Sequence, residues 1–294
     1  SLHDALPISG RGMSEMKYTK RGKMIRFFGI IILAAATLII IFPFYWMVKT
    51  SFQSNSSMFQ VPPSFFPEVI DISSFYEVLM KKPIVIWMKN SLLVTVSVTL
   101  ISMVLSTLTA YSLSRYRNKA NTIFSFLILT TQMLPSTLFV LPIYREFNRF
   151  SLMDTHSGIV IAYTTFALPI CIWMLKGYFD SIPTDLEEAA TIDGCSRLGT
   201  IWRIIMPLAK PGYMATAIFA FINAWGEYLF AKMLLSSQSN WLLSNGLASF
   251  KGEYTTPWNW IMAAAIIYAL PPLILFLFMQ KYLVSGMTAG AVKS

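Results

Sequence analysis

The chain has 294 residues, of which 55% are hydrophobic and only 13% are charged, whereas a soluble domain carries roughly 25% charged residues. Its formal net charge of +9 comes largely from Lys and Arg residues beside apolar segments. That pattern is the orientation signal of membrane proteins and does not indicate nucleic-acid binding. Two histidines and two cysteines, with Cys171 in a span and Cys195 in a loop, predict no metal cluster and no disulfide. We therefore expect a lipid bilayer as partner, with no metal and no cofactor.

Residues 1–12 are interpreted as an assembly artefact, because SLHDALPI is the translation of a common sequencing-library adapter. The natural start is then Met13 or Met16, and the preceding residues are left out of the fold prediction. Residues 13–23 form a short basic tail, and His156 is the histidine that remains in the natural chain.

Long stretches without a charged residue follow the basic tail. Those that exceed the roughly 18 residues of a membrane-span candidate are 27–48, 90–114, 120–144, 155–175 and 254–280. A further stretch, 211–226, ends at Glu227, but its apolar pattern continues as YLFA. We therefore predict an all-α membrane protein whose six transmembrane helices form one domain over 24–284. A second tail follows at 285–294.

Basic residues are more frequent in the segments on the side of the N-terminal tail, such as the loop with Arg115, Arg117 and Lys119, than on the opposite side. This bias predicts that both termini lie in the cytoplasm.

Individual spans carry further signals. The prolines of VPPSFFP exclude a continuous helix between the first and second spans. The second span is rich in Ser and Thr, which let helices approach closely, so we expect it in the middle of the bundle. The third contains Gln132 and Pro135, and such groups are tolerated at membrane depth where they face protein or a water-filled cavity. A packing kink and a place in a transport pathway both remain open for them.

The insert between the fourth and fifth spans, 179–211, is predicted to form two short helices that meet at a corner. In IPTDLEEAATIDG, Thr184 has the position of an N-cap, and Glu187 stands at the capping-box spacing from it. Asp193-Gly194 is a turn dipeptide, and we expect Gly194 to take a positive φ.

The second helix of the insert, RLGTIWRII, can be capped by Ser196 and is expected to stop at Pro207. The first helix carries small or apolar side chains suited to filling a groove: Leu186, Ala189, Ala190 and Ile192.

The spacing within this insert resembles the EAA loop of ABC importer permeases. The matching residues are Glu188, Ala189, Ala190, Gly194, Ile204, Met206 and Pro207. Met206 stands where the family usually has Leu, and Cys195 stands where Ala is common. The resemblance covers nearly all of 24–294, including FINAWGEYLFA and QKYLVSGMTAGAVKS. It is to carbohydrate-importer permeases of the maltose-transporter type, and to the second, shorter permease of the pair.

The resemblance implies a type I ABC importer permease fold in a bacterial inner membrane, with a coupling helix that seats in a cleft of a cytoplasmic ATPase subunit. It implies three protein partners: a second permease, the ATPase subunits and an extracytoplasmic solute-binding protein. Residues assigned to the coupling contact are Glu187, Glu188, Ala189, Ala190, Asp193, Gly194, Ile204 and Pro207. Ala190 is expected to lie against the ATPase. Because the chain has no G-x-x-x-x-G-K-[ST] motif, ATP hydrolysis is assigned to another polypeptide and this chain is not expected to be an enzyme.

Candidates for the substrate pathway are polar or aromatic residues in or beside the spans: Gln132, Asn223, Trp225, Glu227, Tyr228 and the additional aromatic Tyr268. A charge at a helix centre costs about 2.5–3.5 kcal/mol, so Glu227 is expected to face the bundle, the partner permease or the outer interface. A sugar, a polyol and glycerol phosphate all remain open as the solute.

Two other classes of function compete with a permease subunit. An ion-coupled secondary transporter of a small polar solute is the alternative, but it usually needs carboxylates or histidines inside the membrane, and only Glu227 qualifies. A membrane-embedded enzyme would need converging acid, base or metal groups, which this sequence does not supply.

Overall fold

The computed structural model describes residues 20–291 apart from 55, 56, 60, 61, 68, 117 and 252–255. Within these ranges every regular element is helical, which confirms the predicted all-α class. The long elements are α1 (Lys20–Ser51), α3 (Ile84–Arg115), α4 (Lys119–Gln132), α6 (His156–Asp180), α10 (Lys210–Gly226) and α13 (Trp258–Ala291). The short ones are η1 (Ser57–Phe59), α2 (Ser73–Lys81), η2 (Ser136–Phe139), α5 (Val140–Arg149), α7 (Asp185–Ile192), α8 (Arg197–Thr200), η3 (Ile201–Ile205), α9 (Met206–Leu208), α11 (Leu229–Leu234) and α12 (Leu243–Ala248).

Four helices are long and apolar enough to cross a membrane: 26–51 of α1, all of α3, all of α6 and 258–280 of α13. Two bent helix pairs also meet the criterion, 119–132 with 136–149 and 197–208 with 210–226. Counted as one span each, they complete the six predicted spans. The predicted artefact at 1–12 and most of the tail at 13–23 lie outside the described residues, and α13 continues into the stretch predicted as the second tail.

Two predicted spans are wrong in detail, because each is interrupted. The third was expected as one helix over about 121–144, but the chain bends by 92° between α4 and the η2–α5 segment. Pro135 lies at this break in an extended conformation, since proline removes a backbone donor and disfavours the helical conformation of the residue before it. The fifth was expected to reach Leu235, but α10 ends at Gly226 and Glu227 is extended.

The second span, α3, lies in the middle of the bundle, as its composition predicts. It packs along α6 and α10, and its inward face carries buried hydroxyl groups: Ser91, Thr95, Ser102, Ser106, Thr107 and Ser114. Small side chains of this kind permit close helix contacts. Several Thr hydroxyls return a hydrogen bond to the preceding turn, as Thr107 does to the carbonyl of Met103 at 2.6 Å.

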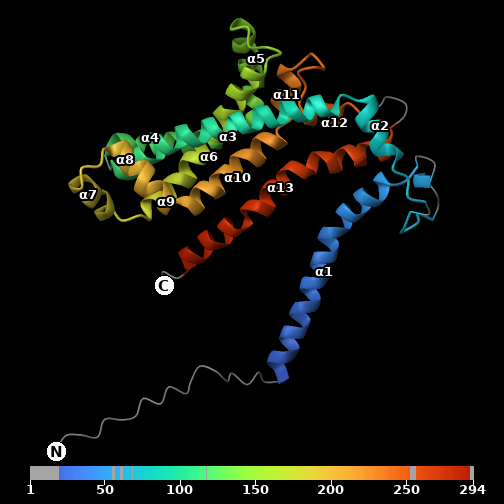
Figure 1. Cartoon of the computed structure of the whole chain (residues 1–294), viewed down its shortest axis with the longest axis horizontal. Coiled ribbons are helices and arrows are strands. Elements are labelled where there is room, and N and C mark those ends of the chain that lie inside the picture. The colour runs from blue at the N-terminus through green and yellow to red at the C-terminus, as the bar shows by residue number, and fades with distance from the viewer. Residues whose placement is uncertain are drawn as a thin grey trace, which may run out of the picture.

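The bundle has two distinct ends (Figure 1). At one end, α7 and α8 form a corner beyond the spans, and at the other, α2 and α12 cover the end of α3. The second end is fixed by side chains of α3, because the Trp87 indole donates to the carbonyl of Gln238 at 2.9 Å and Asn90 donates to that of Ser239 at 2.8 Å. The first span, α1, packs on α13, and its most apolar window is 0% buried. In Figure 1 the two helices come together near the α2 end and diverge from there.

We predict that Gly246→Ala destabilises the end of the bundle that α12 covers. A Cβ at Gly246 would lie 1.9 Å from Cε3 of Trp87, and Trp87 is fully buried. Overpacking of this kind costs roughly 1–3 kcal/mol. Gly177→Ala in α6 is the matched control, because a Cβ there meets nothing within 4 Å and alanine favours the helix by about 0.5–1 kcal/mol. Thermal unfolding in detergent measures both, and equal melting temperatures would contradict the packing described.

Candidate coupling site

The insert after α6 forms two short helices at a corner, as predicted from the sequence. The first is α7, and the second runs through α8, η3 and α9 to Leu208. Together they occupy the end of the bundle opposite α12 (Figure 1). A bend of 86° then separates this second helix from α10, so the corner is joined to the membrane spans on both sides.

The corner itself is a Schellman turn centred on Gly194. The N–H of Cys195 donates to the carbonyl of Ala190 at 2.9 Å, and the N–H of Gly194 donates to that of Thr191 at 3.1 Å. These are the two bonds that define the motif, which needs a left-handed residue directly after the helix. Gly194 supplies it with a φ of 81°, so the predicted positive φ is confirmed. Ser196 caps the next helix by accepting a hydrogen bond from the N–H of Gly199 at 3.2 Å, as expected.

The predicted capping box at the start of α7 is wrong. Thr184 is already helical, with φ −68° and ψ −25°, and its side chain makes no capping hydrogen bond. The carboxylate of Glu187 turns instead toward α3, where it accepts a hydrogen bond from the Tyr111 hydroxyl at 2.6 Å and forms an ion pair with Arg115. A charge-assisted contact to a guanidinium is stronger than a return bond to a neutral backbone N–H, which explains the orientation.

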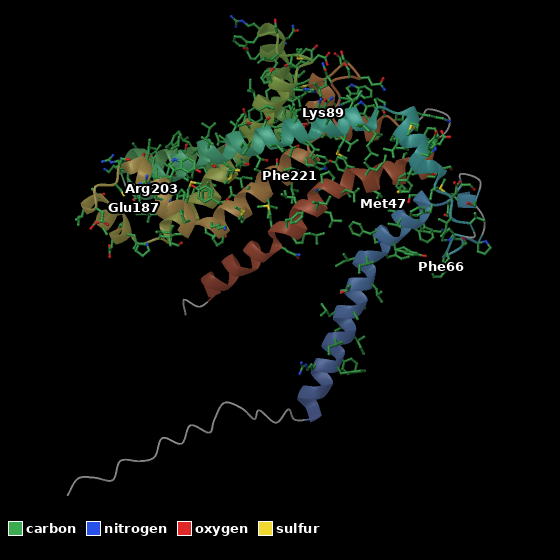
Figure 2. All side chains as sticks on the ribbon, viewed as in Figure 1. Met47, Phe66, Lys89, Glu187, Arg203 and Phe221 are labelled. Atoms are coloured by element: carbon green, nitrogen blue, oxygen red, sulfur yellow. The ribbon has the colours of Figure 1, made fainter. Side chains whose placement is uncertain are left out.

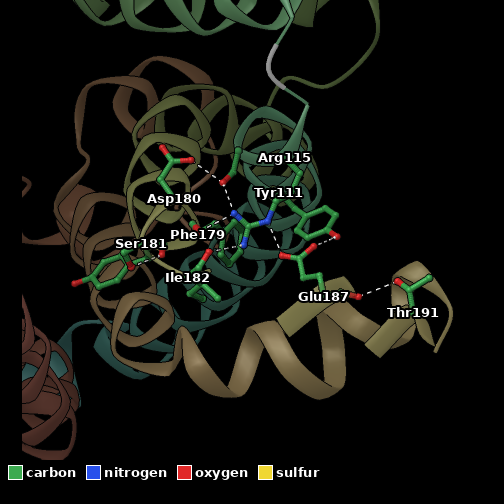
Figure 3. Close-up of polar contacts among 10 residues, drawn as sticks. Tyr111, Arg115, Phe179, Asp180, Ser181, Ile182, Glu187 and Thr191 are labelled. Carbon is green, nitrogen blue, oxygen red and sulfur yellow. Dashed lines mark hydrogen bonds and ion pairs between the residues drawn. The ribbon is translucent and has the colours of Figure 1, made fainter. Parts of the chain in front are cut away.

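The guanidinium of Arg115 joins three segments (Figure 3). It donates from Nε to Glu187 of α7, from Nη1 to the carbonyl of Phe179 at 2.9 Å and from Nη2 to that of Ile182 at 3.2 Å. The Arg115 and Glu187 side chains are only 10% and 13% exposed. Nearby, the Ser114 hydroxyl donates to Asp180 at 2.6 Å. The ends of α3 and α6 therefore hold the base of α7 in one orientation.

The expectation that Pro207 stops the second helix is also wrong. The helix passes through Pro207 and ends at Leu208, after a π-helical turn in which the N–H of Met206 donates to the carbonyl of Ile201. Because proline has no N–H to donate, an ordinary turn would leave a carbonyl without its partner, and single π turns are a common way to accommodate such a break.

The predicted coupling residues fall into two groups. Glu187 faces α3, and Ala190 is 3% exposed within this chain, so the expectation that the Ala190 side chain lies against another subunit is wrong. The others are more accessible: Glu188, Ala189, Asp193, Gly194 and Pro207 are exposed, and Ile204 is half-buried.

The predicted coupling set does not include Ile192, which is 86% exposed at the end of α7. The apolar series of this helix is the sequence signal that points to it. Leu186 on the same helix is 43% exposed, whereas Leu198 and Trp202, with exposures of 60% and 56%, line a pocket with Met103 and Leu108 of α3.

The pathway candidates do not share one environment. Gln132 is exposed at the end of α4, and Asn223 and Tyr228 are exposed on and beyond α10. Trp225 is buried, and two hydrogen bonds pair it with Tyr268. The Trp225 indole donates to the Tyr268 carbonyl at 3.1 Å, and the Tyr268 hydroxyl donates to the Trp225 carbonyl at 2.7 Å.

The carboxylate of Glu227 caps α11. It accepts hydrogen bonds from the N–H groups of Phe230, at 3.1 and 3.2 Å, and Ala231, at 3.4 Å. The contact satisfies donors that a helix start leaves open. A role for Glu227 or the other candidates in a pathway stays a prediction.

Comparison with known proteins identifies the family. The family model described as "Binding-protein-dependent transport system inner membrane component" matches residues 102–289. The chain belongs to this family. It is therefore a multi-pass component of the inner membrane, and the ABC importer permease family expected from the EAA loop is confirmed.

Relatives of this permease match over nearly their whole length. It is 32% identical to the sulfoquinovosyl glycerol transport system permease protein SmoH of Agrobacterium fabrum, over 92% of this chain and 94% of that one. It is 33% identical to the trehalose/maltose transport system permease protein MalG of Thermococcus litoralis, over 87% and 92%. The crystal structure of a bacterial ABC transporter involved in the import of the acidic polysaccharide alginate contains a similar chain. That match has a TM-score of 0.80 at 24% identity, over 90% of this permease and 98% of that chain, and it confirms the permease fold.

We predict that Glu187→Gln lowers the melting temperature of the permease, because Arg115 keeps its carbonyl contacts but loses its charged partner. Removing one member of a buried pair costs 3–5 kcal/mol, and this pair, being slightly exposed, should fall near 3 kcal/mol. Glu188→Gln is the matched control, since the neighbouring Glu188 side chain is exposed. Thermal unfolding in detergent measures the difference. Indistinguishable variants would show that the ion pair does not hold α7.

The backbone of the corner gives a second prediction. Nothing lies within 4 Å of a Cβ at Gly194, so only the positive φ restricts this position. Gly194→Val should cost about 1–3 kcal/mol of local strain, while Gly194→Asn should be nearly neutral because Asn tolerates the left-handed region. Hydrogen–deuterium exchange of the peptide covering 190–196 measures the loss of backbone protection that this strain causes in each variant. Unchanged protection in the Val variant would contradict the Schellman turn.

Proposed function

We propose that this chain is the membrane-spanning permease subunit of an ATP-driven importer, and that it carries a sugar or a related polar solute inward together with a second permease. Separate ATPase subunits dock on the α7 corner, and a solute-binding protein delivers the solute at the opposite end. ATP is hydrolysed on the ATPase subunits and not on this chain. The basic bias of the sequence supports a cytoplasmic position for the α7 end and both termini.

The observation that carries the proposal is the division of α7 into a fixed face and an open face. Glu187 and Ala190 hold the helix against α3 and the rest of the chain, whereas Leu186, Ala189 and Ile192 are exposed. This helix lies beyond the membrane spans (Figure 1), where lipid cannot cover apolar side chains. An apolar surface of this kind marks a contact with another protein.

The same geometry explains how force reaches the membrane. Arg115 links the base of α7 to the end of α3 and to carbonyls at the end of α6, and the second helix of the corner leads into α10. A docked subunit that moves α7 therefore acts on three spans. Two discrete arrangements of such packed elements are the physical basis of a coupled switch.

The solute class rests on the relatives. Their names specify sulfoquinovosyl glycerol and trehalose or maltose, and a structurally similar chain occurs in an alginate transporter in complex with an alginate pentasaccharide-bound periplasmic protein, with a TM-score of 0.65 at 14% identity. We infer a carbohydrate delivered by an extracytoplasmic binding protein. The alternative, an ion-coupled transporter, would need a carboxylate free to bind an ion, and that of Glu227 is engaged in capping α11.

We predict that Ile192→Asp detaches the ATPase subunits from the permease. An apolar side chain of this size contributes about 1.5–3 kcal/mol when it is buried, so its loss should weaken the contact by roughly tenfold or more. Ile72→Asp is the matched control, because Ile72 is 67% exposed and precedes α2 at the other end. Co-purification of the ATPase, measured beside ATP-dependent uptake in vesicles, tests both. Full retention of the ATPase by the Ile192 variant would refute docking on α7.

A further inference from the structure

A cavity of about 310 Å³ lies where the end of α1 meets the turn η1 and the start of α13. It is at the end of the bundle opposite α7, near Met47 in Figure 2. The side chains that line it are a cation, two indoles, an amide, a hydroxyl and two thioethers, from Lys49, Trp46, Trp258, Gln53, Thr50, Met58 and Met262. Neither the coupling site nor the predicted pathway uses any of them.

The cation in this cavity has no acidic partner within the described residues. Lys49 is only 5% exposed, and its Nζ lies 4.1 Å from the centroid of the Trp46 ring. None of the ion pairs found between described residues includes it. An ammonium group with little access to water is costly unless it is paired, and a single indole face compensates only in part. The arrangement therefore favours an anion in the cavity.

Other polar groups beside Lys49 can complete an anion site. Gln53 is 3% exposed and Thr50 is 8% exposed, and both line the same cavity. An amide N–H₂ and a hydroxyl can each donate to an oxyanion. Their burial fixes their positions, so little side-chain entropy would be lost on binding.

We propose that this cavity binds the phosphate headgroup of an anionic phospholipid. Trp46 and Trp258 are close to the ends of two membrane spans, the level at which indoles gather beside lipid headgroups. From Trp46 toward the start of α1, the helix surface is apolar and exposed, with Ile41 52% and Leu38 70% exposed. The acyl chains of a lipid can pack along this surface. The ammonium group of Lys49 can form a charge-assisted hydrogen bond with a phosphate oxygen. A soluble anion would gain nothing from the adjoining apolar surface. The inference goes beyond the proposed transport function and does not depend on the solute.

The test measures lipid binding to the delipidated full chain in detergent by native mass spectrometry. The probes are dioleoyl phosphatidylglycerol, dioleoyl phosphatidylcholine and inorganic phosphate. We expect the first phosphatidylglycerol molecule that binds to do so about tenfold more tightly than phosphatidylcholine, as one favourable charged contact would give. Inorganic phosphate at the same concentration should not displace this lipid. Equal affinities of the wild-type chain for the two lipids would overturn the proposal. Displacement of phosphatidylglycerol by phosphate would show that the cavity binds a soluble anion and not a lipid headgroup, which would also overturn it.

Variants then assign the site. Lys49→Met keeps the apolar stem and removes the charge, so it should abolish the preference for phosphatidylglycerol, whereas Lys49→Arg should retain it. Lys89→Met is the matched control, because Lys89 is exposed on α3 away from the cavity (Figure 2). A Lys49→Met chain that keeps the preference, or a Lys89→Met chain that loses it, would refute the assignment to this cavity.

Discussion

The guanidinium of Arg115 lies where the end of α3, the end of α6 and the base of α7 come together, and the geometry of this end of the permease depends on it. The last carbonyls of a helix have no partner within the helix, and the Phe179 carbonyl at the end of α6 accepts from the N–H of Ile182 at 3.1 Å as well as from Arg115. Arg115 donates to it and to the carbonyl of Ile182 beyond the helix, while its remaining edge binds Glu187. Only arginine has a planar set of donors that can serve three acceptors in fixed directions.

This constraint matters because α7 has only eight residues and would not be stable as a helix alone. Its start is fixed through Glu187, its middle through the buried Ala190 and its end through the turn at Gly194. What stays open is the outer face that ends in Ile192. A short helix held at three points can transmit a push to the spans, whereas a flexible loop would absorb it.

Local sequence signals predicted the corner well, since Gly194 and Ser196 act through bonds to residues a few positions away. The orientation of Glu187 was not predictable in this way, because Arg115 is 72 residues distant and both a capping box and an ion pair fit the local pattern. Six apolar stretches predicted the spans, but Pro135 alone could not distinguish a kinked helix from a bend of 92°. The environment of Lys49 depends on the start of α13, far along the chain, and left no signal in the sequence.

The interruption of the third span also explains why this permease needs a second membrane subunit. The helix α4 has 14 residues and rises about 21 Å, which is short of the roughly 30 Å of the hydrocarbon layer. The break that follows it therefore falls at membrane depth if α4 starts at the interface, and Met133 within the break is 82% exposed on this chain. Backbone without helical hydrogen bonds is tolerated at that depth only where protein covers it or water fills a cavity. The break after α10 is satisfied within this chain instead, because the Glu227 carbonyl accepts hydrogen bonds from the hydroxyls of Tyr163 at 3.1 Å and Ser244 at 3.3 Å. A single chain that leaves the break after α4 open to lipid would be unstable, so the surface beside α4 must be completed by a partner permease or by the aqueous path that the two permeases enclose.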